Sequence, residues 1–367
     1  MQTQAALMAL EAMSNKYGSD PAYVLAGGGN TSYKEKDVLY VKGSGTALAT
    51  IKAADFVRID RARLGAVWGK TYPENEAARE AAVLSDMMAA RVDGETRRPS
   101  VETLLHDLFP YRYVLHLHPT EVNGVTCAKE GQKAIAALFP DAVFVANAKP
   151  GYTLAALCRV RLTDRAKTQG KFPDVVFLQN HGVFFAADTT EQLDAMVARV
   201  MTAIDARVKT RPDATEAPVD EAKAAKIAAA VRSLYGEGGE AAVRLCHTRA
   251  ALSYDPVVLS FTPDHIVYCK AAPLVLSEGE DLPEKYAAFV AARGYKPKVV
   301  YVRGLGAFCC GATEKEAATT AAVFADAVAI AAYAASFGGA SPLPAWLEDF
   351  IVHWEVESYR AKVSQKG

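Results

Sequence analysis

The sequence predicts an α/β protein of two domains. Short apolar strands alternate with amphipathic helical segments up to about residue 208, and the 367 residues exceed the roughly 150 of a typical domain. The stretch 210–226 is rich in Pro, Asp and Ala and has few large apolar side chains, which is typical of a connection between domains. We therefore expect a first domain over residues 1–209 and a second over residues 218–367.

The elements follow from local hydrophobic patterns. The chain begins with an amphipathic helix whose apolar side is Leu7, Leu10 and Met13. Further helices are expected near 75–91, 101–109 and 190–208, and strands at 37–43, 111–119, 141–147 and 174–182. In the second domain we expect strands at 257–261, 265–270 and 298–304, and an Ala-rich helix at 317–335.

Composition excludes several classes of protein. The 41 Lys and Arg nearly balance 42 Asp and Glu, so nothing in the net charge favours binding to nucleic acid or to an anionic membrane. The N-terminus lacks a basic start and a long apolar stretch, so we expect no signal peptide. The six Cys have no CxxC spacing, which indicates reduced core cysteines in a cytoplasmic protein.

Two segments that lie 124 residues apart resemble each other. Residues 175–192 and 299–316 share five of eighteen positions, and each is expected to lead from a strand through a Gly loop to a helix. A weaker similarity pairs 38–45 with 266–273. In these pairs His181 is matched by Leu305, and the turn 43–45 is matched by 271–273. Either the similarity is accidental, or the second domain is a duplicated copy that has lost its site.

Three histidines form a candidate metal site. His116 and His118 alternate along one strand, so their side chains point to the same face. His181 stands where another strand ends and Gly182 begins a turn. Three His with an open fourth position suit a catalytic Zn²⁺, and Co²⁺, Mn²⁺ and Fe²⁺ accept the same ligands. The alternative is a pair of hydrogen-bonded histidines without a metal.

Several polar residues precede this cluster. Ser100 and Glu102 follow Pro99 at an expected helix start, where capping is the ordinary role, although a carboxylate beside a metal can also act as a general base. The glycine-rich turns 25–34 and 41–47 offer backbone N–H groups to an anion such as phosphate. They match neither the dinucleotide nor the P-loop spacing, and ordinary hairpin turns are the alternative.

Taken together, these motifs resemble the class II aldolase/adducin family. GGGNTS, KGSG, PSVE, HLHP and QNHG occur in this order over about residues 20–200. The rest of the chain looks most like the aldolase half of bifunctional rhamnulose-1-phosphate aldolase/alcohol dehydrogenases, with no dinucleotide fingerprint for the dehydrogenase half. The resemblance implies a three-layer α/β/α fold with a mainly antiparallel central sheet, followed by a degenerate aldolase-like domain without metal ligands.

The resemblance also implies roles for individual residues. His116, His118 and His181 match the metal ligands, and Glu102 matches the acid/base residue. Asn30, Ser44, Gly45 and Ser100 match positions that hold the substrate phosphate. Val101 departs from the family, because many members have a hydroxyl residue there, and Lys42 is a neighbouring cation that compensates. A catalytic Tyr has no clear match, and Tyr295 and Tyr359 are the candidates.

The function so implied is that of a metal-dependent lyase in carbohydrate metabolism. It cleaves a ketose 1-phosphate to dihydroxyacetone phosphate and an aldehyde through a metal-stabilised enediolate. The partners implied are a small sugar phosphate and further copies of the chain in a dimer or tetramer. A pentulose-phosphate 4-epimerase, a sugar-acid-phosphate decarboxylase and a non-catalytic adducin-like binding role are the alternatives.

Overall fold

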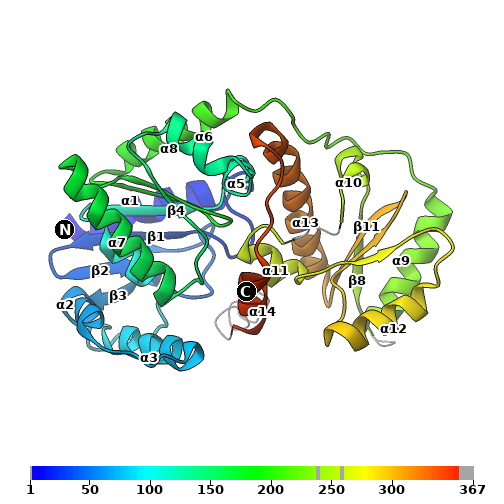
Figure 1. Cartoon of the computed structure of the whole chain (residues 1–367). Coiled ribbons are helices and arrows are strands. Elements are labelled where there is room, and N and C mark those ends of the chain that lie inside the picture. Colours follow the sequence, from blue (N-terminus) through cyan, green and yellow to red (C-terminus); the bar gives the residue numbers. More distant parts are fainter. Residues whose placement is uncertain (1, 237–239, 257–259, 355–367) are drawn as a thin grey trace. The chain divides into compact units, whose positions relative to one another are not determined.

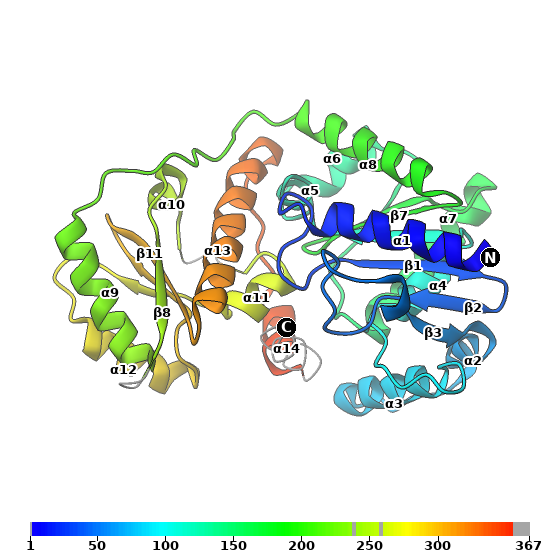
Figure 2. The ribbon, with the colours of Figure 1, turned by 180° about the vertical axis from the view of Figure 1, so that it is seen from behind.

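The computed structural model describes residues 2–236, 240–256 and 260–354. These described residues divide into two compact units, of which the first holds 2–122 and 132–206 and the second holds 123–131 and the described residues from 207 to 354. The boundary at 206/207 lies just before the expected connection, whose last part is already helical because α9 (Glu221–Gly236) begins inside it. Each unit has its own sheet (Figures 1 and 2).

The first unit is built on a seven-stranded sheet in the order β3-β2-β1-β4-β7-β6-β5. All neighbours are antiparallel except the parallel pair β5 and β6, which confirms the expected mainly antiparallel sheet. The strands are β1 (Asn30–Glu35), β2 (Val38–Val41), β3 (Val57–Asp60), β4 (Tyr113–Leu117), β5 (Val143–Val145), β6 (Val175–Leu178) and β7 (Gly182–Ala187).

Helices cover both faces of this sheet and complete the three-layer α/β/α arrangement. One face carries α1 (Gln2–Gly18), with Leu7, Leu10 and Met13 buried as expected, and α8 (Thr190–Asp205) (Figure 2). The other face packs against α3 (Glu76–Ala89), α4 (Thr103–Leu108) and α7 (Tyr152–Gln169). The remaining helices are α2 (Arg61–Gly65) and α6 (Gly131–Leu138), while α5 (Thr120–Thr126) begins in the first unit and ends in residues of the second.

The second unit holds a four-stranded sheet in the order β8-β11-β10-β9. Its strands are β8 (Ala242–Cys246), β9 (Leu274–Leu276), β10 (Val299–Val302) and β11 (Gly306–Gly311). On one face lie α9 and α12 (Leu282–Arg293). The other helices are α10 (Arg249–Ser253), α11 (Pro263–Cys269), α13 (Glu314–Ala334) and α14 (Ala345–His353), and α13 packs against β8 and β11.

The long helix α13 is the only part of the described chain with the length and apolar composition of a membrane span, counted over Glu314–Phe337. A core helix has the same properties. Val323, Phe324 and Ala327 of α13 are buried, as expected for a helix that packs on the second sheet.

The second sheet repeats part of the first, strand by strand. β6 and β10, β7 and β11, and the first residues of α8 and α13 each lie 124 residues apart. β5 pairs with β6, and β9 with β10, in parallel and in the same register. β8 likewise pairs with β11 as β4 pairs with β7. Among the described residues of the second unit, nothing corresponds to β1, β2 and β3.

Two expectations for the second domain fail. The strand expected at 265–270 is wrong, because these residues lie in and just after α11, which begins at Pro263 behind a capping box of Thr262 and His265. All seven residues of α11 are buried, so hydrophobicity alone could not distinguish helix from strand. The weaker repeat, 38–45 with 266–273, therefore pairs a strand with a helix and is wrong. Of the expected strand 257–261, residues 257–259 lie outside the described part.

Candidate metal centre

His116 is held by β7, the neighbour of its own strand. It is fully buried and lies opposite Phe184 in the β4–β7 register. The two rings stack with centroids 4.0 Å apart and planes 12° apart. The Nδ1 atom is 3.0 Å from the carbonyl oxygen of Val183. A carbonyl only accepts, so Nδ1 carries a proton, which leaves Nε2 as the ring nitrogen that can bind a metal ion.

His181 approaches from the turn between β6 and β7. It follows Asn180, which is buried and has the left-handed φ of 54° that Asn tolerates. The side-chain oxygen of Asn180 accepts a hydrogen bond of 3.2 Å from Asn147 in the loop after β5. Gly182 must lack a side chain, because a Cβ there would lie 2.4 Å from the carbonyl oxygen of Leu117 and 2.7 Å from the His118 ring.

The three imidazoles converge on one point. One ring nitrogen from each of His116, His118 and His181 lies within 4.8 Å of the other two, and the Nε2 atoms of His116 and His118 are 3.0 Å apart. In a tetrahedral zinc site with Zn–N bonds of about 2.05 Å, ligand nitrogens lie about 3.3 Å apart. The donor set and its spacing therefore fit a divalent ion.

Glu102 completes the cluster. Its Oε1 atom lies 3.2 Å from Nε2 of His116 and 3.4 Å from Nε2 of His181. Burial alone would raise the pKa of Glu102, but the adjacent His116, His181 and His118 hold it well below its usual range. Glu102 occupies the N-cap position of α4 without a side-chain capping bond, so its carboxylate serves the cluster and not the helix end.

Asn30 and Ser100 join the glycine turns to this carboxylate. The Asn30 side-chain nitrogen donates to the Ser100 hydroxyl and, over 3.2 Å, to Oε2 of Glu102. The Ser100 hydroxyl also accepts from the backbone N–H of Glu102 at 3.2 Å. Asn30 is the first residue of β1, and its Cα pairs with that of His116 in the sheet. The structure thus brings His116, His118, His181, Glu102, Asn30 and Ser100 together.

The other predicted substrate residues lie in the turns themselves. The Lys42 ammonium is buried and donates to the carbonyl oxygens of Gly27 and Gly29 at 3.1 and 3.0 Å, so it shapes the turn that carries Asn30. The backbone N–H of Ser44 donates to the carbonyl oxygen of Arg98 at 2.9 Å. Gly45 has a φ of +84°, which favours glycine.

The other histidines lie outside the three-imidazole cluster. Burial holds the pKa of His106 well below its usual range, and its Nδ1 lies 2.8 Å from the Ser32 hydroxyl. His265 caps α11, and His353 is exposed. By strand register, positions 116, 118 and 181 correspond to Leu245, His247 and Leu305 in the second unit. Only one of these three positions therefore keeps an imidazole.

Both candidate tyrosines lie outside the described part of the first unit. Tyr359 lies outside the described residues. Tyr295 belongs to the second unit, where its ring packs on Phe289 and faces Lys270.

The sequence did not reveal three groups that orient the histidines. Phe184 and the Val183 carbonyl contact His116, and the Asn147–Asn180 hydrogen bond holds the turn that carries His181. The first two follow from the register of β4 and β7. The third follows from the parallel pairing of β5 and β6, which places the loops after both strands at one sheet edge.

Comparison with known proteins assigns the family. The model of the "Class II Aldolase and Adducin N-terminal domain" matches residues 12–207, which is more than half of the chain. The chain belongs to the class II aldolase and adducin family. The matched range contains all three histidines and Glu102. Class II aldolases depend on a metal ion, and the three-histidine cluster is where this member can hold one.

Individual relatives of this class II aldolase family member are distant. An uncharacterized oxidoreductase, YuxG, from Bacillus subtilis (strain 168) is 25% identical over 95% of this chain, and the chain spans 57% of the length of that relative. A class II aldolase domain from Thermoplasma acidophilum is 28% identical, covers 54% of this chain and 91% of its own, and has a TM-score of 0.45. An L-fuculose-1-phosphate aldolase from Thermus thermophilus is 15% identical, covers 55% of this chain and 91% of its own, and has a TM-score of 0.36.

Proposed function

We propose that this chain is a metal-dependent lyase that cleaves a ketose 1-phosphate to dihydroxyacetone phosphate and an aldehyde. The observation that carries the proposal is the position of Glu102, which contacts His116 and His181 on one side and Asn30 on the other. A proton-transferring group thus lies between a three-imidazole ligand set and the turns that offer hydrogen bonds to an anion.

Each residue of this cluster has a chemical task. His116, His118 and His181 would hold the ion, most simply Zn²⁺, with Co²⁺, Mn²⁺ and Fe²⁺ as alternatives. When bound, such an ion stabilises negative charge that develops on the substrate oxygens. Asn30, Ser100, the Ser44 side chain and the backbone N–H of Gly45 would hold the phosphate and orient the substrate, while Lys42 keeps the turn that carries Asn30 in shape.

Glu102 would transfer the proton. In the cleavage direction, the carboxylate of Glu102 takes up the proton released by the hydroxyl group that becomes the aldehyde carbonyl. The electron pair of the broken carbon–carbon bond stays on the fragment that bears the phosphate, and Glu102 then gives the proton to that carbon. In the reverse direction, its ionised carboxylate removes the same proton from dihydroxyacetone phosphate.

The experiment is a panel of ketose 1-phosphates, with a coupled assay for dihydroxyacetone phosphate and metal analysis of the purified protein. We expect release of dihydroxyacetone phosphate, lost together with the metal in His181→Ala. Glu102→Gln should retain the metal and lower kcat by at least about 100-fold. Normal turnover by Glu102→Gln would contradict the assigned role, and interconversion of pentulose phosphates without free aldehyde would favour a 4-epimerase.

We also propose that the second domain, residues 218–367, is a degenerate copy without a metal site. The four strands from β8 to β11 pair with one another in the same order and register as the four strands from β4 to β7, which supports this. One ion per chain is expected, and His247→Ala should leave the metal content unchanged. A homo-oligomer, dimer or tetramer, is expected in sedimentation velocity.

A further inference from the structure

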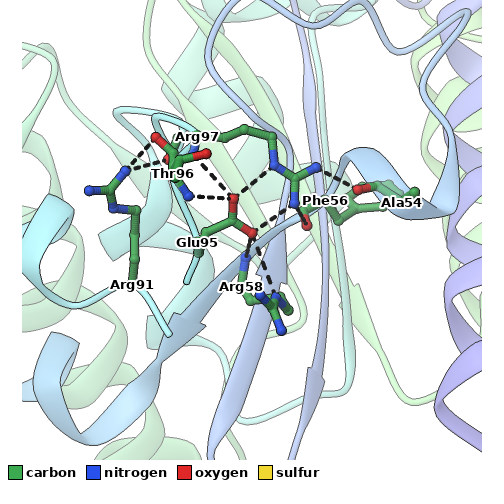
Figure 3. Close-up of polar contacts among 7 residues, drawn as sticks. All are labelled: Ala54, Phe56, Arg58, Arg91, Glu95, Thr96 and Arg97. Atoms are coloured by element: carbon green, nitrogen blue, oxygen red, sulfur yellow. Dashed lines mark hydrogen bonds and ion pairs between the residues drawn. The ribbon is translucent and has the colours of Figure 1, made fainter. Parts of the chain in front are cut away.

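A second polar network lies in the first unit, in the segment that leads to Ser100 and Glu102. This segment, residues 91–102, contains no helix or strand apart from isolated bridges at Arg91 and Pro99. Figure 3 shows the Glu95 carboxylate at its centre, with Arg97 and Arg58 around it. The Glu95 side chain is only 3% exposed, although Glu is rarely buried without a specific reason.

The Glu95 carboxylate is satisfied by several donors. The guanidinium of Arg97 donates to both of its oxygens, at 2.8 and 2.7 Å. The backbone N–H groups of Thr96, Arg97 and Arg58 donate at 3.1, 3.1 and 3.4 Å. The hydrogen bond from Arg97 outweighs the effect of burial and lowers the pKa of Glu95 to about 2.

The same network fastens the segment to its surroundings. The Arg97 guanidinium also donates to the carbonyl oxygens of Ala54 and Phe56, which precede β3. From the other side, Arg91 donates to the carbonyl oxygens of Thr96 and Arg97 (Figure 3). Residues 95–97 are therefore fixed in space by contacts with residues that are distant in the sequence.

Fixing these residues determines where the next ones lie. The Arg98 carbonyl oxygen accepts from Ser44, Pro99 forms a bridge with Gly43, and the N–H of Ser100 donates to the carbonyl oxygen of Lys42 at 3.1 Å. Ser100 and Glu102 then contact Asn30. The segment thus runs from the Glu95 network directly into the proposed phosphate turns.

We infer that Glu95, with Arg97, is a positioning residue that sets the placement of Ser100 and Glu102 for binding of the phosphorylated substrate. The Glu95 carboxylate is buried while the Arg97 side chain is 42% exposed, and such an ion pair contributes little net stability, but its bidentate geometry defines position. The histidines come from β4 and from the β6–β7 turn, so the network should affect ligand binding without affecting the metal. This inference rests on the proposed function.

The test compares Glu95→Gln with Asp93→Asn in the metal-loaded full chain. Glu95→Gln keeps the shape of the side chain and removes its charge, while Asp93 lies in the same segment with a side chain 88% exposed. Dihydroxyacetone phosphate is the probe, with titration calorimetry for its affinity and elemental analysis for metal content. We expect Glu95→Gln to bind the probe at least tenfold more weakly with unchanged metal content, and Asp93→Asn to match the wild type.

Kinetics provides a readout that general loosening of the fold would not give. Glu95→Gln should raise KM for the ketose 1-phosphate at least tenfold and lower kcat less, whereas Glu102→Gln lowers kcat. Equal probe affinity in wild type and Glu95→Gln, or loss of the metal in Glu95→Gln, would overturn the inference while the proposed function stands. A wild type that does not bind the probe would overturn the proposed function, and this inference with it.

If Glu95→Gln does not fold, Arg97→Lys decides. Lys keeps the charge but cannot reproduce the forked contacts of Arg97 with Glu95, Ala54 and Phe56. Weaker probe binding by Arg97→Lys, smaller in extent than expected for Glu95→Gln, supports the inference, and unchanged binding overturns it.

Discussion

The neighbouring strand β7 fixes the orientation of His116, a proposed metal ligand on β4. His116 receives its tautomer from the Val183 carbonyl and its ring plane from Phe184. The sequence shows that His116 and His118 share a face, but not that β7 supplies both supports, because strand register is a long-range property. From the sequence, specific roles for His116, His118, His181 and Glu102 could be predicted only through the family resemblance, which rests on five motifs in a fixed order.

The buried ammonium group of Lys34 lowers the stability of the folded protein. It is buried on β1, where its ammonium donates to the Tyr111 carbonyl oxygen at 3.1 Å, and burial lowers the pKa of Lys34 to about 7. The unfolded chain keeps this proton up to about pH 10.4. Between about pH 7 and 10 the unfolded state therefore binds more protons, and this residue makes the free energy of unfolding rise with pH.

Lys34→Met should remove that dependence. We expect it to stabilise the protein by about 1 to 3 kcal/mol at pH 7 and by less at pH 10, since one pKa unit corresponds to about 1.4 kcal/mol. Urea unfolding at both pH values measures this, with exposed Lys133→Met as the control. Equal stabilisation at pH 7 and pH 10 would show that Lys34 is charged in the folded state.

At the element scale, the turn between β6 and β7 depends on Gly182. Gly306 holds the same position between β10 and β11, and an added Cβ would meet a backbone carbonyl oxygen at 2.4 Å in the first turn and 2.3 Å in the second. Only the first turn carries a histidine of the three-imidazole cluster.

Gly182→Ala should therefore displace His118 and His181 and weaken metal binding by about 10- to 100-fold, the usual effect of disturbing the supports of a site. Gly306→Ala, which also strains a φ of +117°, should lower stability without changing metal affinity. Chelator competition measures the affinities, and thermal unfolding measures the stabilities. Equal metal affinity in Gly182→Ala and wild type would contradict this account of the turn.

Prediction of elements succeeded where sequence signals are local. Helices α3, α4 and α8 and strands β2, β4, β5 and β6 lie within their expected ranges. The interpretation of each repeat as strand, loop and helix omitted β7 and β11, because these fully buried strands lack the alternation of a half-exposed strand. The network around Glu95 was also missed, because it joins residues that are far apart in sequence.

At the scale of the whole molecule, each unit has its own hydrophobic core. One core lies between the first sheet and α3, α4 and α7, and another lies between the second sheet, α9 and α12. Domains with separate cores can unfold separately, and a ligand stabilises only the unit that binds it.

Calorimetry should accordingly resolve two transitions. Zn²⁺ at 100 times its Kd should stabilise the first unit by about 2.7 kcal/mol and leave the second transition in place. His181→Ala should abolish the shift. A single transition that moves as a whole with added metal would show that the units unfold together.

The shorter second sheet has a consequence for solubility. Among the described residues, β8 is the end strand of its sheet, whereas β4, its counterpart, is covered by β1. Open strand edges recruit other chains and promote aggregation. Here the edge is only five residues long, carries Arg244, and is bridged just beyond its end by Thr248 and Glu216. These features make β8 a poor template for intermolecular β-pairing, which matters for any protein kept at high concentration.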